Sequence, residues 1–257
     1  MTRLLAWLRI APSRARVALP RHGLKGFVRE SVLHGRRLVR LQEEHVWYEL
    51  RLRELPPIPP LEEHLRLVIA DDDQLDQVIG QNVAIARRRV AAGHDQMMLL
   101  DGDAVLSSAC VFRGNAEVLA APGKQLPLPN GTVCCEDAYT SPKDRRRGHG
   151  SIGLLAIIAR LREEGIERML IKVASENHAA RGAAVRIGFE PLARVRLDRI
   201  GLHKRVEVEV LNDSPAAAQL AGSFGARASV LNGKSTPPVA STDERPQPPV
   251  SPDTTGA

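Results

Sequence analysis

A turn rich in arginine and glycine carries the residue types that bind a phosphate group. The turn consists of Arg145, Arg146, Arg147, Gly148, His149 and Gly150. Ser151 and an apolar stretch from 152 to 161 follow, and we expect this stretch to form a helix. Glycines let the backbone approach a ligand closely, and a helix start offers unpaired N–H groups and the positive end of a dipole. The turn therefore predicts a pyrophosphate site, with Ser151 capping the helix or donating to a phosphate oxygen.

The spacing of the glycines excludes two other phosphate-binding loops. No third glycine follows at the spacing of the dinucleotide fingerprint, and no Gly-Lys-Ser/Thr triplet closes the turn as in an ATP-binding loop. The alternative interpretation is a basic surface loop before an ordinary helix. The surroundings favour a binding site, because residues 132–140 are predicted to form a strand that leads into the turn, and a second motif lies downstream.

The second motif consists of residues 177–180 (Asn-His-Ala-Ala) and 186–189 (Arg-Ile-Gly-Phe). In this order and at this separation, the two motifs resemble the GNAT superfamily of acyl-coenzyme A N-acyltransferases. The resemblance covers about residues 65–211 and is sharpest from 136 to 191. It implies an α/β (α+β) fold with a mixed, mostly antiparallel sheet flanked by helices.

The resemblance also implies acetyl-CoA as the acyl donor and an amine as the acceptor, with no metal. In that family the strand before the turn pairs with the pantetheine arm, the turn holds the pyrophosphate, and the asparagine contacts the cofactor arm. The cofactor-binding residues implied at the matching positions are Ala138, Tyr139, Thr140, Arg145, Arg146, Arg147, Gly148, His149, Gly150, Ser151 and Asn177. A helix cap is the simpler role for Asn177, and the two roles are compatible.

An acyl transfer to an amine needs a base, because a free amine such as that of lysine keeps its proton up to about pH 10. Glu136 is the candidate, since alternation along a strand places it on the face of Ala138 and Thr140. The alternative is that Glu136 or Asp137 only faces solvent. A backbone N–H near Tyr139 is the candidate donor to the developing oxyanion.

The chain departs from the family at the general acid. Many members carry a tyrosine seven residues after the asparagine, but that position is Ala184 here. The two tyrosines of the chain are Tyr48 and Tyr139. Alternation along the strand places Tyr139 on the face opposite Glu136. Water or another residue would then protonate the thiolate. The alternatives are an acyltransferase that uses a longer acyl chain, from CoA or acyl carrier protein, and a non-catalytic CoA-binding regulatory module.

Positive charge is concentrated near the N-terminus. The formal net charge is +6, and residues 1–46 hold ten Lys or Arg against three Glu, a balance of +7. The basic character is therefore local and does not indicate a nucleic-acid-binding protein, because aromatic residues are not interleaved with the charges. Contact of residues 1–46 with a membrane surface is less expected than a solvated extension or a helix packed on the core.

The cysteines and the apolar runs predict a cytoplasmic protein. Cys110, Cys134 and Cys135 show no metal-ligand spacing, and neighbours in a strand point to opposite faces, so we expect buried free thiols. The longest apolar run, 152–159, is too short to span a membrane, and the run 4–8 is too short for a signal peptide. The oligomeric state stays open.

Prolines and composition predict three segments. Four prolines at 56, 57, 59 and 60 predict a stiff linker, since each ring fixes φ and removes an N–H donor. We therefore expect a basic extension with its linker at 1–60, the N-acetyltransferase-like domain at 61–211, and a tail at 212–257. The tail has almost no large apolar residues and is predicted to be disordered.

Periodicity and turn residues predict the elements of residues 61–211. The predicted strands are 65–70, 96–100, 104–112, 132–140 and 168–174, followed by a hairpin of 190–196 with 205–211. The predicted helices are 74–92, 150–164 and 178–187. Residues 113–131 are predicted to be a long loop, and one function for such a loop is to border the acceptor pocket.

Overall fold

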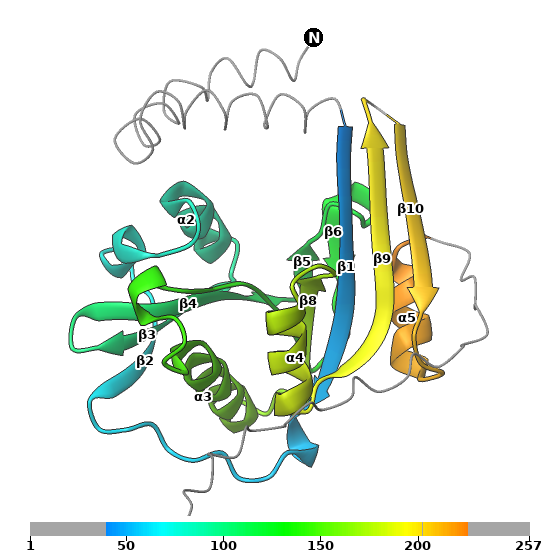
Figure 1. Ribbon diagram of the computed structural model, residues 1–257. Coiled ribbons are helices and arrows are strands. Elements are labelled where there is room, and N and C mark those ends of the chain that lie inside the picture. The colour runs from blue at the N-terminus through cyan, green and yellow to red at the C-terminus, as the bar shows by residue number, and fades with distance from the viewer. Residues whose placement is uncertain (1–39, 202, 226–257) are drawn as a thin grey trace, which may run out of the picture.

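The computed structural model describes residues 40–201 and 203–225, and its central feature is one large sheet (Figure 1). The strands are β1 (Arg40–Arg51), β2 (Leu65–Ile69), β3 (Asp95–Asp101), β4 (Ala104–Arg113), β5 (Asn115–Glu117), β6 (Gln125–Pro127), β7 (Thr132–Thr140), β8 (Arg168–Ala174), β9 (Glu190–Ile200) and β10 (His203–Val210). Eight strands pair in the order β10-β9-β1-β8-β7-β4-β3-β2, and β5 pairs with β6. Within the eight-stranded sheet, only β7 and β8 run parallel. The predicted mixed, mostly antiparallel sheet is therefore confirmed.

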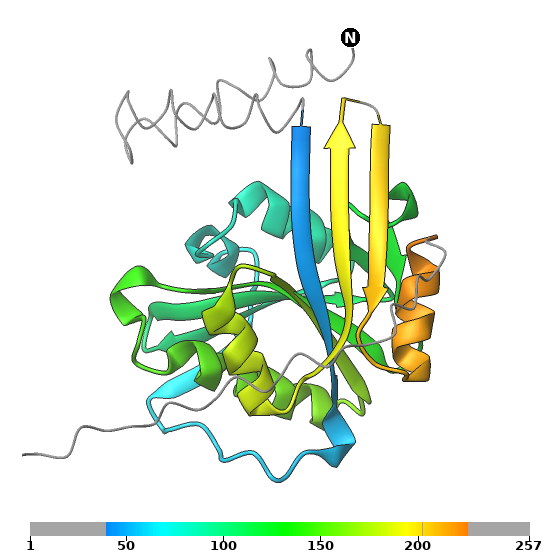
Figure 2. The same ribbon diagram turned by 45° about the vertical axis from the view of Figure 1, so that its right-hand side comes forward.

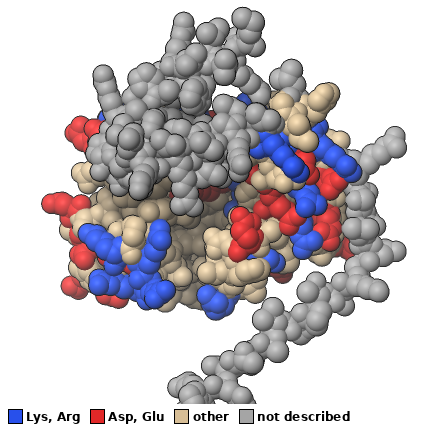
Figure 3. Space-filling view, turned by 45° about the horizontal axis from the view of Figure 1, so that its top comes forward, with Lys and Arg blue, Asp and Glu red and all other residues tan. Residues whose placement is uncertain are grey.

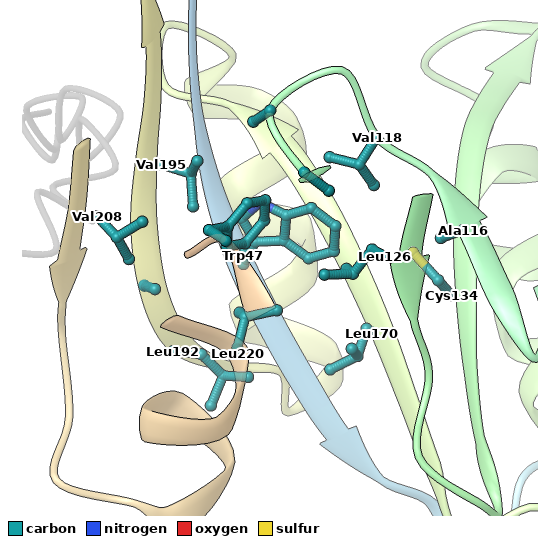
Figure 4. Close-up of a cluster of buried hydrophobic side chains, with 14 of the residues drawn as sticks. Trp47, Ala116, Val118, Leu126, Cys134, Leu170, Leu192, Val195, Val208 and Leu220 are labelled. Atoms are coloured by element: carbon teal, nitrogen blue, oxygen red, sulfur yellow. The ribbon is translucent and has the colours of Figure 1, made fainter. Parts of the chain in front are cut away.

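Helices cover both faces of this sheet. The helices are α2 (Val83–Ala91), α3 (His149–Glu163), α4 (His178–Ile187) and α5 (Pro215–Ser223). One core lies between the sheet and the helices α3 and α4, and it contains Cys135. The other core lies on the opposite face, beneath the β5–β6 hairpin and α5, and it contains Cys134 (Figure 4). The two adjacent cysteines thus point to opposite faces, and all three thiols are free and buried, as predicted.

Strand β1 places the start of the domain before the predicted residue 61. It lies between β8 and β9 in the middle of the sheet, and Figure 2 shows it rising beside β9 and β10. Tyr48 packs in the core beneath α3 and α4, while Trp47 packs in the opposite core. A strand buried on both faces reads as an unbroken apolar run, and the stretch 46–48 has this character. Residues 1–39 of the predicted extension lie outside the described residues.

Helix α5 lies inside the segment 212–257, for which the sequence predicts disorder. Its start is capped by Ser214, whose Oγ accepts a hydrogen bond from the N–H of Ala217 at 3.1 Å. Leu220 is buried, and the ring of the following Phe224 packs edge-on against Trp47 at 5.8 Å. This apolar contact orders the helix, so the prediction is wrong for residues 215–223. Residues 226–257 lie outside the described part of the chain.

The predicted helix 74–92 is divided in two. A 3₁₀ turn covers Gln74–Gln77, and α2 begins only after Asn82, whose side chain accepts a hydrogen bond from the N–H of Ala84. Between them Gly80 has a φ of 82°, and a Cβ at this position would lie 2.2 Å from Cγ of Tyr139. The close approach of the Tyr139 ring, which local periodicity cannot reveal, thus fixes the break.

The predicted loop 113–131 contains the β5–β6 hairpin and a 3₁₀ turn at Pro122–Lys124. Ala116, Val118 and Leu126 of this segment are buried against Trp47 (Figure 4). The segment is therefore a cover for one sheet face. The closing hairpin of β9 and β10 is present, with β9 longer than predicted.

Candidate active site between strands β7 and β8

Strands β7 and β8 separate at one end and leave an opening in the sheet. Their parallel pairing ends at Cys135 opposite Ile171, although β7 continues to Thr140 and β8 to Ala174. Beyond that point β7 is paired with β4, and β8 with β1. The edge of β7 that faces β8 is therefore free of strand pairing there. Such an edge can pair with an extended ligand through its backbone groups.

A bulge interrupts β7 at this opening. Cys110 of β4 lies opposite Glu136, and Ser108 lies opposite Tyr139, so two steps along β4 match three along β7. Asp137, within the bulge, is in the left-handed conformation with a φ of 52°. Bulges of this kind insert one residue and change the direction in which the following side chains point.

The bulge overturns the predicted strand faces. Because one extra residue shifts the alternation, Glu136 and Tyr139 lie on the same face, and Thr140 lies on the other. The prediction that Glu136 shares a face with Ala138 and Thr140 is therefore wrong. The prediction that Tyr139 lies opposite Glu136 is wrong for the same reason. A salt bridge from Arg89 Nη1 to Asp137 Oδ2, at 2.6 Å, supports the bulge.

The turn 145–151 leads into α3 as the sequence predicts. Arg146 and Gly148 have left-handed backbones, with φ of 64° and 83°. Helix α3 begins at His149, and the carbonyl of Gly148 accepts from the N–H of Ser151 at 2.9 Å. A turn that mixes right-handed and left-handed residues directs successive N–H groups toward one side and forms an anion-binding concavity. The first N–H groups of the helix add to it.

Two glycines allow α3 to lie close to the strands. A Cβ at Gly150 would lie 2.7 Å from Oγ1 of Thr140, and a Cβ at Gly153 would lie 2.5 Å from Oγ of Ser107. A small cavity remains between α3 and the strands. Its walls bring together four of the predicted cofactor-binding residues, Ala138, Tyr139, Thr140 and Gly150.

The three arginines at 145–147 are exposed around this turn. The guanidinium of Arg145 lies 5.3 Å from the centre of the Tyr139 ring. Arg147 Nη1 is 3.9 Å from Oδ1 of Asp144, a pair that leaves most of the arginine side chain in solvent. Figure 3 shows Lys and Arg gathered in one part of the face and mixed with Asp and Glu in another. Exposed guanidinium groups beside a helix start suit a phosphate ligand.

Asn177 caps helix α4. Its Oδ1 accepts a hydrogen bond from the N–H of Ala180 at 3.1 Å, and the residue is exposed. The capping role is therefore shown, and the contact with the cofactor arm stays a prediction. Further along α4, Ala184 is buried, and Tyr48 lies in the same core, with its hydroxyl accepting from Nε of Arg181 at 3.1 Å.

Glu136 and Lys172 form a buried ion pair immediately beyond the last β7–β8 pair. Lys172 Nζ lies 2.7 Å from Glu136 Oε2, and the side chains are 21% and 3% exposed. Burial raises the pKa of Glu136, and the nearby ammonium opposes part of this effect. Burial alone would lower the pKa of Lys172, but the attraction of the Glu136 carboxylate leaves it raised. The alternative that Glu136 faces solvent is therefore excluded, and Lys172 is a site residue that the sequence did not indicate.

The ion pair lines a cavity of about 670 Å³, on the sheet face opposite α3. Val118 and Leu119 of the predicted loop 113–131 form one wall of this cavity. Trp47 of β1, with Val195 and Leu197 of β9, forms another. Asp137 lines this cavity, whereas Ala138 to Thr140 line the small one. The bulged end of β7 therefore borders one cavity beside the turn and a larger one on the other face.

His45 lines the large cavity as well. Burial and the charge of Lys172 lower the pKa of His45 below its ordinary value, while Glu43 and Glu176 act in the opposite direction. The imidazole is therefore neutral near pH 7 and can accept a proton. Sequence reasoning missed this residue because it lies within the segment assigned to the basic extension.

Two absences concern only residues 40–201 and 203–225. No group of three or more His, Cys, Asp or Glu side chains there is arranged to hold a metal ion. No helix in the same part of the chain is long and apolar enough to cross a membrane.

Comparison with known families identifies the family of this chain. The sequence profile of the acetyltransferase (GNAT) family matches residues 41–189, and the chain belongs to this family. The match includes β1 and both motifs. Members of the family use an acyl-CoA as co-substrate and bind an amine acceptor. A search of curated protein sequences found no significant match.

Solved structures of GNAT proteins are similar to this chain at low identity. A GCN5-related N-acetyltransferase from Sphaerobacter thermophilus is 14% identical, with a TM-score of 0.44 over 72% of this chain and 57% of that one. A tandem GNAT protein from the clavulanic acid biosynthesis pathway is 17% identical, with a TM-score of 0.46 over 62% and 54%. The chain thus spans little more than half the length of either structure. Such likeness carries no argument about substrate.

Proposed function

We propose that this protein transfers an acyl group, most simply acetyl, from acyl-CoA to a primary amine by direct attack on the thioester. The observation that carries the proposal is the bulged end of β7. It borders the turn and helix start on one side and a cavity with a buried carboxylate on the other. A donor held at the turn and an amine held in the large cavity would meet at the opening between β7 and β8.

The turn fits the diphosphate of CoA. The close contact of Gly150 with Thr140 leaves no room for a side chain at that position. His149 Nδ1 is buried beside the turn without a hydrogen-bond partner among the described residues, and in its protonated tautomer it could donate to a phosphate oxygen. In this proposal the N–H groups at the turn bind the diphosphate, and the unpaired edge of β7 at 138–140 pairs with the pantetheine arm.

Near neutral pH the acceptor is an ammonium, so two protons leave its nitrogen, one before the attack and one after the new bond forms. The amine nitrogen forms a bond to the thioester carbonyl carbon, the carbon–sulfur bond breaks, and the thiolate departs. We assign the proton that leaves before the attack to Glu136, reached directly or through a water molecule, and the second proton passes to solvent water. The fixed ammonium of Lys172 keeps the carboxylate in place and supplies positive charge where negative charge develops. His45 is the second candidate base, since it is neutral and borders the same cavity.

The departing thiolate takes its proton from water in this scheme. No tyrosine stands at the usual position, because Ala184 occupies it and is buried. A backbone N–H at the bulge, near Tyr139, would donate to the oxyanion. Two alternatives persist, a donor with a longer acyl chain carried by CoA or acyl carrier protein, and a regulatory module that binds CoA without turnover.

Thiol release from acetyl-CoA with a panel of primary amines tests the proposal, combined with mass spectrometry of the amines. We expect thiol release that depends on the amine and an acetylated product. A series of acyl-CoA donors of increasing length, and an acyl carrier protein, separates the second alternative. Calorimetric binding of CoA with no modified amine would favour the regulatory module. Absence of heat with any CoA thioester, on folded protein, would contradict all three.

A further inference from the structure

The large cavity extends away from Glu136 and Lys172 into a second cavity of about 270 Å³. The two share Leu119, Gly123, Lys124 and Leu197 as lining residues, so they adjoin, and together they are here called the acceptor groove. Its walls come from the 3₁₀ turn Pro122–Lys124 on one side and from β9 and β10 on the other. One end carries the proposed chemistry, and the far end is lined by Arg199 and Lys204, which pair with each other next to the turn between β9 and β10.

The far end of the acceptor groove is basic. Lys124, Arg199 and Lys204 line it, and none of the described residues that line this second cavity is acidic. At the end near β7, cations and carboxylates both line the groove and form pairs. Those pairs are Lys172 with Glu136, Arg88 with Glu117, and Arg89 with Glu117 and Asp137.

One carbonyl group contacts both Lys204, through its ammonium, and Lys124, through its backbone. The carbonyl of Ala121 accepts from Lys204 Nζ at 3.0 Å and from the backbone N–H of Lys124 at 3.1 Å. Lys124 has a φ of 64°, a left-handed backbone conformation that is unfavourable for a residue with a side chain. Burial and the charge of Lys124 lower the pKa of Lys204. Two like charges thus lie near each other in a place where an anion would relieve their repulsion.

We propose that the acceptor carries an anionic group, a carboxylate or a phosphate, which binds at Lys124 and Lys204 while its amine lies at Glu136. The proposal rests on the proposed function of the site. The apolar walls between the two ends, including Trp47, Leu119 and Leu197, suit an apolar spacer. The basic end is not a further subsite for the phosphates of CoA, since α3 and its turn lie on the other face of the sheet.

Steady-state kinetics of the full chain at saturating acetyl-CoA tests the proposal. The acceptors are an alkylamine, an α,ω-diamine, an ω-aminocarboxylate and an ω-aminophosphonate of equal chain length, each in several lengths. We expect kcat/KM for the best anionic acceptor to exceed that of the matched alkylamine by about tenfold or more, the range of a charge-assisted hydrogen bond. The diamine should be the poorest. Comparing carboxylate with phosphonate distinguishes the two sources of negative charge.

Single substitutions locate the effect. Lys204→Met and Lys124→Met should each raise KM for the anionic acceptors severalfold or more, and by a larger factor than KM for the alkylamine, so that the preference for an anion is lost. Arg205→Met is the matched control, because Arg205 pairs with Glu207 on the exposed surface of β10 and does not line the groove. The preference for an anion should survive in this control.

The outcomes separate the two proposals. Turnover of alkylamine and aminocarboxylate with equal kcat/KM would overturn the anion site and leave the acyltransferase intact. Lack of turnover with every amine would contradict the proposed function. In that case calorimetry with the aminocarboxylate tests the anion site directly. The anion site would be overturned if the unsubstituted chain did not bind the aminocarboxylate. It would also be overturned if Lys124→Met and Lys204→Met bound it as tightly as the unsubstituted chain.

Discussion

At the scale of single residues, the pair of Glu136 and Lys172 sets the expected pH dependence. Burial raises the pKa of Glu136, so the carboxylate takes up a proton at a higher pH than an exposed glutamate would. As a base it works only when ionised, and its contribution is therefore lost as the pH falls through this raised pKa. Lys172 remains charged because its pKa lies above the ordinary value. We therefore expect the low-pH limb of the activity profile to follow the ionisation of Glu136, the proposed base.

We expect Glu136→Gln to lower kcat/KM near neutral pH by about 10²- to 10⁴-fold, the usual contribution of general base catalysis. The loss should shrink toward about pH 10, where the acceptor amine gives up its proton unaided. A pH–rate profile of the variant measures both effects. Glu44→Gln is the matched control, because Glu44 pairs with Arg194 and Arg196 away from the groove.

A Glu136→Gln profile with the shape and height of the unsubstituted one would remove Glu136 as the base. His45 would then be tested by His45→Gln. The pKa of His45 is lowered, so its imidazole takes up a proton only below the usual histidine range. A loss of rate in that pH range in the unsubstituted protein, absent from His45→Gln, would assign the base to His45. The two profiles together assign the base.

At the scale of elements, the approach of α3 to β7 determines whether the turn can hold CoA. Gly150→Val would place a branched side chain where Oγ1 of Thr140 lies, at 2.7 Å from the first added atom. We expect α3 to move away and the dissociation constant for CoA to rise by about tenfold or more, equivalent to about 1.4 kcal/mol. Titration calorimetry measures this change.

Gly222→Ala in α5 is the control for that experiment. A Cβ at Gly222 meets no atom within 4 Å, and the position is helical. Alanine there should stabilise the fold by roughly 0.5–1 kcal/mol and leave CoA affinity unchanged. Equal CoA affinity in Gly150→Val and the unsubstituted chain would show that the contact between α3 and β7 does not shape the site.

Strand β1 gives a second prediction at this scale. A chain that begins at residue 61 lacks the strand between β8 and β9, and Trp47 is missing from its core. We expect this shortened chain to lose cooperative thermal unfolding, because two strand edges and an apolar core face become exposed. Circular dichroism during heating, compared with the full chain, measures it. Cooperative unfolding of the shortened chain would mean that β1 is dispensable.

Local signals explain which elements the sequence predicts correctly. The hairpin around residues 101–103, the turn before α3, and α4 each depend on turn residues and periodicity within a short window. Strand β1 is not predicted, because prolines and charged residues surround it in the sequence. Its place in the sheet depends on β8 and β9, which lie far along the chain. The bulge at Asp137 is not predicted either, because alternation of side chains along a strand cannot reveal an inserted residue. Arg89, which forms the salt bridge with Asp137, comes from α2, far away in the sequence.

The candidate site divides in the same way. The phosphate turn is predictable, because glycines, arginines and a helix start lie side by side in the sequence. Lys172, His45 and the acceptor groove are not, since each depends on strands brought together by the sheet. Glu136 is predictable as an acidic residue near the chemistry, but its strand face is not.

At the scale of the whole molecule, the sheet consists of two halves joined by a short seam. Strands β2, β3, β4 and β7 form one half, and β8, β1, β9 and β10 form the other. Among residues 40–201 and 203–225, the two halves pair only through the parallel segment 132–135 with 168–171. A donor that lies along the free edge of β7 would occupy the place where the two halves separate. Binding should therefore stabilise the seam as well as the turn.

Hydrogen exchange with and without CoA tests this last expectation. At a CoA concentration of about 100 times the dissociation constant, linkage predicts a stabilisation of about 2.7 kcal/mol, provided that the unfolded chain does not bind. We expect the amides of residues 136–140 and 172–174 to gain protection together with those of the turn 145–151. The Gly150→Val variant at the same CoA concentration should gain little. Protection confined to the turn would mean that CoA binds through its phosphates alone and that the pantetheine arm does not lie in the opening.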